Sequence, residues 1–146
     1  MNYLLDTNVI SELLLKHPDL NVVGWIQGIE ENLLHISVIT IGEIKKGIEK
    51  LPEPPRKQEL ADWLEGDLLE RFRDRIVPLD VHVLLCWGEL AARLEISGKP
   101  MPAIDSLIAA TALQGEFILV TRNPSDFEHV GVRTFNPWIS PKKAQV

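Results

Sequence analysis

Four acidic side chains stand beside the ends of apolar segments that are spread along the whole chain. They are Asp6 in Leu4-Leu5-Asp6-Thr7-Asn8, Glu43 in Thr40-Ile41-Gly42-Glu43, Asp105 in Asp105-Ser106-Leu107-Ile108-Ala109, and Asp126 in the segment 119–127. Acidic residues that meet at the carboxyl edge of a parallel sheet can share one pocket. Such a pocket carries too much negative charge to stand alone, so it indicates a divalent cation and metal-dependent chemistry on phosphate.

The residue types favour hydrolysis assisted by Mg²⁺. This ion binds carboxylates, waters and substrate phosphate, and two such ions would hold the attacking and leaving oxygens of a phosphodiester. The sequence has no Gly-x-Ser-x-Gly motif and no Gly-rich phosphate loop. Zinc-ligand spacing is also missing from the single cysteine, Cys86, and from the four histidines, which are His17, His35, His82 and His129.

Each acidic residue also has a purely structural interpretation. Thr40 and Glu43 have the spacing of a capping box at the start of a helix. Asp6 could cap a helix, Asp105 could complement a helix dipole, and Asp126 could form an Asx turn. Independent capping does not require all of these residues to lie at one edge of a sheet, so their joint pattern favours the metal site.

The elements that must position these residues alternate between short strands and helices, which predicts an α/β fold with a mostly parallel sheet. Apolar runs predict strands at 3–5, 35–38, 76–77, 117–120 and 132–135, and 3.6-residue spacing predicts helices at 10–14, 19–29, 41–51, 60–72, 80–97 and 102–114. The break at Pro52-Glu53-Pro54-Pro55 is too short to divide domains and indicates a turn between two helices.

The length of 146 residues fits one domain, and the net charge of −6 is unusual for a protein that binds nucleic acid. The four motif carboxylates account for most of this charge. Lys45, Lys46, Lys50 and Arg122 lie near the motifs and could form a positive rim around the pocket. No apolar run is long enough to span a membrane and no secretory signal is visible, so a cytoplasmic location is expected.

Five segments, in order, resemble the PIN-domain ribonucleases of the VapC/FitB toxin type. They are Leu-Leu-Asp-Thr-Asn-Val-Ile-Ser-Glu at 4–12, Ile-Thr-Ile-Gly-Glu-Ile at 39–44, Ile-Asp-Ser-Leu-Ile-Ala-Ala-Thr-Ala at 104–112, Leu-Val-Thr-Arg-Asn at 119–123 and Phe-Asn-Pro-Trp at 135–138. The ordered set spans nearly the whole chain and is much more specific than Asp-Thr-Asn alone.

The resemblance implies a three-layer α/β/α sandwich, with residues 1–146 forming a single PIN-like nuclease domain that carries a helical arm at about 44–75. It also implies an Mg²⁺- or Mn²⁺-dependent endoribonuclease that acts as a toxin, forms a homodimer and is neutralised by a small antitoxin. By this resemblance Asp6, Glu43 and Asp105 are the core metal ligands. Asn8 and Thr121 support them through hydrogen bonds.

One position differs from the family pattern. Some relatives carry an aspartate where this chain has Asn123, directly after Thr121-Arg122, and the nearest carboxylate is Asp126. A hard cation prefers a charged ligand to a neutral amide. We therefore predict that Asp126 is the fourth carboxylate, either in the metal site or in its outer shell, with Asn123 orienting a bound water or Asp6 and with Arg122 supporting the site.

Three other functions remain open at this level: a nuclease acting on DNA or structured nucleic acid, a metal-dependent RNA-binding regulator with little cleavage, and an interaction module of flavodoxin-like shape. A separate prediction concerns the arm. Its apolar stripe is expected to pack against another chain, and the alternative is packing on its own domain; the stripe consists of Leu60, Trp63, Leu64, Leu68 and Phe72.

Overall fold

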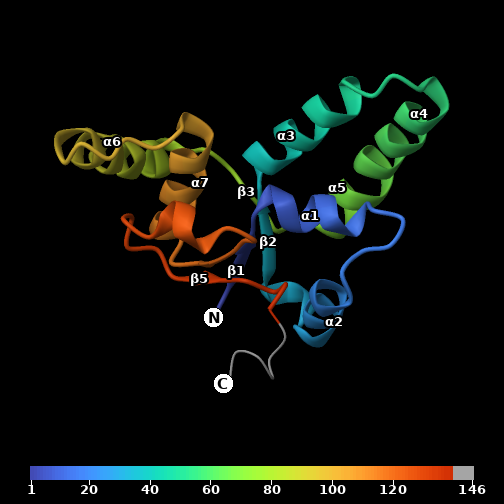
Figure 1. Ribbon diagram of the computed structural model, residues 1–146, viewed down its shortest axis with the longest axis horizontal. Coiled ribbons are helices and arrows are strands. Elements are labelled where there is room, and N and C mark those ends of the chain that lie inside the picture. The colour runs from blue at the N-terminus through green and yellow to red at the C-terminus, as the bar shows by residue number, and fades with distance from the viewer. Residues whose placement is uncertain (140–146) are drawn as a thin grey trace.

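The computed structural model, which describes residues 1–139, is built around a parallel sheet of five strands (Figure 1). The strand order is β3-β2-β1-β4-β5, and every neighbouring pair is parallel. The strands are β1 (Tyr3–Leu5), β2 (Leu34–Ser37), β3 (Ile76–Val77), β4 (Ile118–Val120) and β5 (Thr134–Phe135). The chain builds outward from β1 in one direction and then in the other, so the sheet has a switch point between β1 and β4.

Side chains on the sheet alternate between two buried cores. Leu5, Leu34 and Ile36 belong to one core, whereas Leu4 and Leu119 belong to the other. Successive residues of a strand point to opposite faces, so a short run of buried leucines serves both cores at once. Helices cover both faces, which confirms the predicted three-layer α/β/α sandwich.

The first core is covered by helices from the first half of the chain. They are α1 (Thr7–Leu13), α2 (Leu20–Gly28), α3 (Val38–Glu49), α4 (Pro54–Asp62), a π-helical segment η2 (Trp63–Leu68) and α5 (Leu69–Arg71). A single-turn 3₁₀ helix, η1 (Glu31–Leu33), precedes β2. Asp19 caps α2, since its carboxylate accepts hydrogen bonds from the backbone N–H groups of Asn21 and Val22.

The second core is covered by α6 (Val81–Ile96) and α7 (Ala103–Gln114), which pack against each other. Small residues on α7 bring its backbone close to the sheet: Ala109, Ala110 and Ala112 are fully buried. The indole N–H of Trp87 donates to the Ser106 hydroxyl over 2.9 Å and links the two helices. This packing fixes α7, whose first turn carries Asp105.

The arm is a hairpin of α3 and α4 that projects from the sheet (Figure 1). The prediction that its apolar stripe needs another chain is wrong for the later part of the stripe. Leu64, Leu68 and Phe72 are buried in the first core, and Leu60 and Trp63 pack against that core. The chain returns to the first core after α4, from Leu64 onward, so the stripe covers its own domain.

The start of α3 also differs from the prediction. Val38 belongs to the helix rather than to the strand, and Ser37 is the N-cap, with its hydroxyl accepting from the backbone N–H of Ile39. The interpretation of Thr40 and Glu43 as a capping box is therefore wrong, because both lie inside the helix. Glu43 consequently sits in the second turn of α3, not the first.

Within residues 1–139, no helix is long and apolar enough to cross a membrane. The last seven residues of the predicted 1–146 domain lie outside the described part of the chain.

Candidate active site

Asp6 stands where β1 gives way to α1, beside the switch point of the sheet. Its backbone N–H donates to the carbonyl of Val120 over 2.9 Å, which ties it to the end of β4. Its Oδ1 accepts from the backbone N–H of Thr7 over 2.8 Å, so Asp6 is also the N-cap of α1. The structural role considered for Asp6 is thus confirmed, and its second oxygen remains free of this role.

That second oxygen is held by Thr121, the first residue after β4. The Thr121 hydroxyl donates to Asp6 Oδ2 over 2.8 Å, and its side chain is completely buried. The same Oγ1 accepts from the Asn8 side-chain amide over 3.3 Å and from the Asn123 backbone N–H over 3.2 Å. One hydroxyl therefore connects the carboxyl ends of β1 and β4 and fixes the orientation of Asp6.

Glu43 is positioned by two threonines: Thr7, which the sequence did not single out, and Thr40, for which the sequence indicated only a helix cap. The Thr7 hydroxyl donates to Glu43 Oε1 over 2.5 Å, and the Thr40 hydroxyl lies 3.0 Å from Thr7 Oγ1. Since the proton of Thr7 goes to the carboxylate, Thr40 is the donor in the second bond. Thr7 touches both acids, Asp6 through its backbone and Glu43 through its side chain.

Asp105 and Asp126 approach from the other core. Asp105 lies in the first turn of α7, as predicted, and Asp126 lies in a short 3₁₀ helix, η3 (Pro124–Phe127). Burial raises the pKa of the Asp105 carboxyl, and the nearby charge of Asp126 raises it further. Phe127 is buried beneath them in the second core and anchors η3 there.

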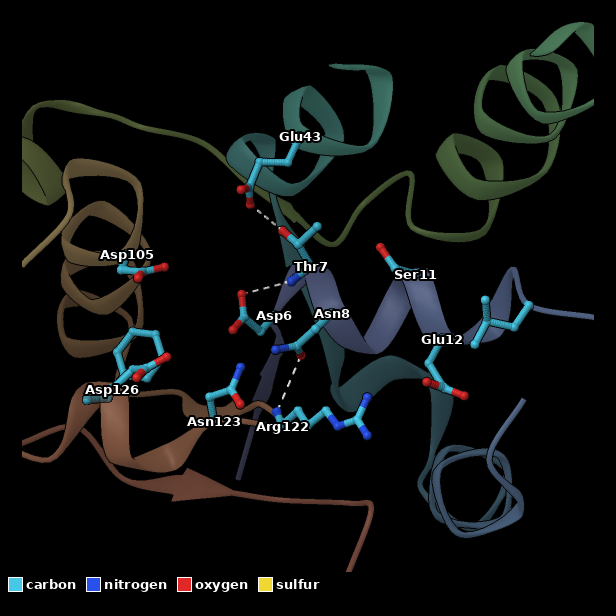
Figure 2. Close-up of a pocket in the computed structure, with 12 residues that line it drawn as sticks. Asp6, Thr7, Asn8, Ser11, Glu12, Glu43, Asp105, Arg122, Asn123 and Asp126 are labelled. Carbon is cyan, nitrogen blue, oxygen red and sulfur yellow. Dashed lines mark hydrogen bonds between the residues drawn. The ribbon is translucent and has the colours of Figure 1, made fainter. Parts of the chain in front are cut away.

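The predicted residues converge on one open pocket of about 460 Å³ at the carboxyl edge of the sheet (Figure 2). Its lining contains Asp6, Asn8, Glu43, Asp105, Arg122, Asn123 and Asp126. Thr121 is not part of the lining and stands behind Asp6. The sequence analysis missed Thr7, Ser11, Glu12, Leu15 and Phe127, which also line the pocket. Glu12 follows Asn8 by one turn on the same face of α1, so helical spacing from Asn8 was the signal available for it, whereas Leu15 lies beyond the end of the helix.

The environment of the pocket shifts the pKa values of two of its acidic side chains. Burial raises the pKa of Asp6, and the nearby charges of Asp105 and Glu43 raise it further, against the hydrogen bonds from Thr121 and Thr7. Burial also raises the pKa of Asp105, with added contributions from Asp126 and Glu43. Both acids are therefore harder to ionise than ordinary aspartates, which is the signature of carboxylates that need a counter-charge.

The chemistry of the donor set fits a hard divalent cation, because the pocket lining supplies several carboxylate oxygens and the side-chain amides of Asn8 and Asn123. As they stand, no three acidic, histidine or cysteine side chains among residues 1–139 are close enough together to enclose one ion. A cation at this site would thus be held by one or two carboxylates at a time, with water completing its shell, as Mg²⁺ commonly is.

A family model, related sequences and a solved structure all match this chain over most of its length. The family model for the PIN domain matches residues 3–132. The chain is 37% identical over 134 residues to "VapC ribonuclease Y4jK" of Sinorhizobium fredii, covering 92% of this chain and 96% of that protein. It is 36% identical to "Toxin FitB" of Neisseria gonorrhoeae, covering 92% and 97%. The crystal structure of FitAcB from Neisseria gonorrhoeae superposes with a TM-score of 0.89 at 36% identity, covering 94% of this chain and 99% of that one.

Proposed function

This chain belongs to the PIN-domain family and resembles its VapC and FitB toxins, and on that basis we propose that it is a divalent-metal-dependent endoribonuclease. In this proposal it hydrolyses RNA phosphodiester bonds with Mg²⁺ or Mn²⁺ and acts as the toxin of a toxin–antitoxin pair. The relatives' names support a nuclease of this kind.

The observation that carries the proposal is the gathering of Asp6, Glu43, Asp105 and Asp126 around one pocket. Burial raises the pKa values of two of these carboxyl groups, Asp6 and Asp105, and repulsion from neighbouring acidic groups raises them further. A fold would gain stability by losing such a cluster, so its presence favours a role in binding a cation and a polyanionic substrate.

Each residue has a part in this mechanism. Asp6, Glu43 and Asp105 would hold the cation, one or two of them directly and the others through bound water, and the cation would supply Lewis-acid chemistry at a phosphate oxygen. Thr121 and Thr7 orient Asp6 and Glu43 before substrate arrives, so less reorganisation is needed during the reaction. Asp126 is proposed as the fourth carboxylate, beside Asp105, and the Asn123 amide would orient water or Asp6.

We also infer that the chain binds a small antitoxin protein and pairs with a second copy of itself in the cytoplasm. Structural neighbours that are VapBC and FitAB toxin–antitoxin complexes support the antitoxin. Val81, Leu84 and Leu85 lie exposed on one side of α6, which supports association through that helix. Light scattering at micromolar concentration should report a dimer, and Leu85→Glu should shift it toward the monomer.

We take the whole chain, residues 1–146, to act as one nuclease domain with the α3–α4 hairpin as its arm. The experiment that tests the proposed activity uses the purified chain without a partner. Mixed cellular RNA and single-stranded DNA are incubated with it in Mg²⁺, in Mn²⁺ and in EDTA. RNA cleavage is expected in either metal and no cleavage in EDTA.

The variants in this experiment separate the site from the surface. Asp6→Asn and Asp105→Asn should each lower the cleavage rate by at least ~100-fold, equivalent to roughly 2.7 kcal/mol. Asp67→Asn is the matched control, since Asp67 is exposed and does not line the pocket. Equal cleavage in EDTA would end the metal-nuclease proposal. Preference for DNA would indicate the alternative nuclease, and binding without cleavage would indicate the regulator.

A further inference from the structure

The segment that follows β5 turns back to the rim of the pocket. The side-chain amide of Asn136 donates to the carbonyl of Arg122 over 3.3 Å, and its Oδ1 accepts from the backbone N–H of Trp138 over 2.9 Å. The carbonyl of Trp138 in turn accepts from the Asn21 side chain over 3.0 Å. Trp138 is therefore fixed between α2 and the pocket by hydrogen bonds at its backbone.

The ring of Trp138 lies against Arg122. The guanidinium carbon of Arg122 is 5.2 Å from the Trp138 ring centroid, within the range of a cation–π contact. The backbone N–H of Arg122 also donates to Asn8 Oδ1 over 3.4 Å. Both the backbone and the side chain of this exposed arginine are thus held in place.

The positive charge of Arg122 is not paired with an acidic side chain within the described part of the chain. No salt bridge among residues 1–139 involves Arg122. The raised pKa values of Asp6 and Asp105 arise from burial and acidic neighbours, and Arg122 does not offset them. An aromatic face holds a guanidinium without neutralising it, so the N–H donors at its edge remain able to bind an anion.

The guanidinium also lies in a distinct part of the pocket. Figure 2 shows it on the side of Ser11 and Glu12, away from Asp105 and Asp126. Glu12 is the acidic residue of α1 on this side of the pocket. Its Oε2 accepts a hydrogen bond from the backbone N–H of Asp19 over 2.9 Å. The pocket therefore has four carboxylates on one side and, on the other, an oriented cation with Glu12 as the one acidic neighbour from α1.

We propose that Arg122 binds a phosphate of the RNA strand that flanks the phosphate to be cleaved, and that Trp138 is the positioning residue that holds the guanidinium there. The inference rests on the proposed ribonuclease function. A polyanion that approaches four carboxylates needs an attractive contact nearby, and a planar guanidinium can bind phosphate through two parallel hydrogen bonds. The acidic side of the pocket then receives one phosphate while Arg122 receives its neighbour.

Binding in the absence of metal tests this contact separately from cleavage. The full chain is titrated onto a fluorescently labelled single-stranded RNA of mixed sequence in EDTA, at several salt concentrations. Arg122→Gln should weaken binding by roughly 5- to 10-fold and lower the slope of log K against log salt by about 0.7, the value for one lost phosphate contact on a single strand. Arg133→Gln is the matched control, because this exposed arginine lies at a different pocket, beside Met1, and should leave both quantities unchanged.

Variants of Trp138 test the positioning role. Trp138→Leu should give part of the loss seen with Arg122→Gln, Trp138→Phe should restore most of the affinity, and adding Trp138→Leu to Arg122→Gln should cause no further loss. In Mg²⁺, Arg122→Gln should raise KM more than it lowers kcat.

Two results would overturn the inference. The first is an Arg122→Gln variant that matches wild type in affinity and salt slope. The second is a Trp138→Leu substitution that weakens binding equally with and without Arg122, which would show a general structural defect. If either result is obtained while the wild-type chain still cleaves RNA, the roles proposed for Arg122 and Trp138 fail and the proposed ribonuclease function stands. A wild-type chain that neither binds nor cleaves RNA loses both proposals.

Discussion

The Thr121 hydroxyl lies 2.8 Å from Asp6 Oδ2 and is fully buried at the switch point of the sheet. It donates its only proton to Asp6 and accepts from Asn8 and Asn123. Its hydrogen-bonding capacity is therefore completely used. Asn8 in turn accepts from the backbone N–H of Arg122, so a continuous chain of hydrogen bonds links the acidic side of the pocket with its basic rim.

Thr121→Val tests this connection. The variant keeps the shape of the side chain and removes the hydroxyl, which leaves a buried oxygen of Asp6 without its donor. We expect a loss of about 1–3 kcal/mol in the free energy of unfolding and a cleavage rate at least ~10-fold lower. Urea unfolding and RNA cleavage assays measure both, and Thr121→Ser, which keeps the hydroxyl, should behave like wild type. Normal activity of Thr121→Val would show that Asp6 needs no such orientation.

Asp126→Asn tests the fourth carboxylate. Because Asp126 lies close enough to Asp105 to raise its pKa, its charge should add to cation binding at low Mg²⁺. We expect a ~10-fold lower rate at limiting Mg²⁺, equivalent to roughly 1.4 kcal/mol, and partial recovery at high Mg²⁺. A neutral Asp126→Asn together with a more active Asn123→Asp would instead assign the fourth position to Asn123.

The pH dependence of stability tests the crowding of the carboxylates. The fold raises the pKa of Asp105 through burial and through Asp126 and Glu43. The folded chain therefore binds this proton more readily than the unfolded chain, and the ionised form costs stability at pH values above the raised pKa. In EDTA, Asp105→Asn should be more stable than wild type at neutral pH, even though it gives up a charge that the α7 dipole favours.

That difference should shrink as the pH falls through the raised pKa of Asp105, and it should vanish below the ordinary value of 3.8. Urea unfolding at a series of pH values measures it, with Asp67→Asn as the exposed control. Added Mg²⁺ should stabilise wild type more than Asp105→Asn, because only the folded wild-type site binds the ion fully. A less stable Asp105→Asn in EDTA at neutral pH would contradict the crowding of charge.

Phe72→Ala tests the packing of the apolar stripe against its own domain. Phe72 is fully buried in the first core, so its truncation should cost about 3–5 kcal/mol of unfolding free energy. Ile96→Ala is the control, since Ile96 is 88% exposed, and it should change stability by less than about 0.5 kcal/mol. If Phe72→Ala left the stability of the chain intact and altered only its association, the stripe would belong to an interface.

The sequence was informative where a residue stands at the end of a strand. Asp6 follows β1 directly, and the burial of Leu4 and Leu5 on opposite faces agrees with a short apolar run in a covered parallel sheet. The first turn of α7 was also predictable, because Pro102 precedes it and Asp105 falls within it. These positions depend on local patterns of a few residues.

The sequence was less informative where tertiary contacts decide. Thr40 and Glu43 have capping-box spacing, but Ser37 caps α3 one turn earlier, because β2 ends there. Thr7 binds Glu43 across 36 positions of sequence, and Trp138 reaches Arg122 only after β5 has joined the sheet. The π-helical turn of η2, which lies in the stripe that returns to the first core, has no local signal in the pattern of apolar residues.

The central claim is that the four-carboxylate pocket cleaves RNA with a divalent cation. The most direct measurement is the single-turnover cleavage rate of a labelled RNA as a function of Mg²⁺ concentration, for wild type, Asp6→Asn and Asp67→Asn. The account predicts a saturable rise with Mg²⁺ for wild type and Asp67→Asn, and a rate at least ~100-fold lower for Asp6→Asn at every concentration. A wild-type rate that does not depend on Mg²⁺, or an Asp6→Asn rate equal to wild type, would contradict it.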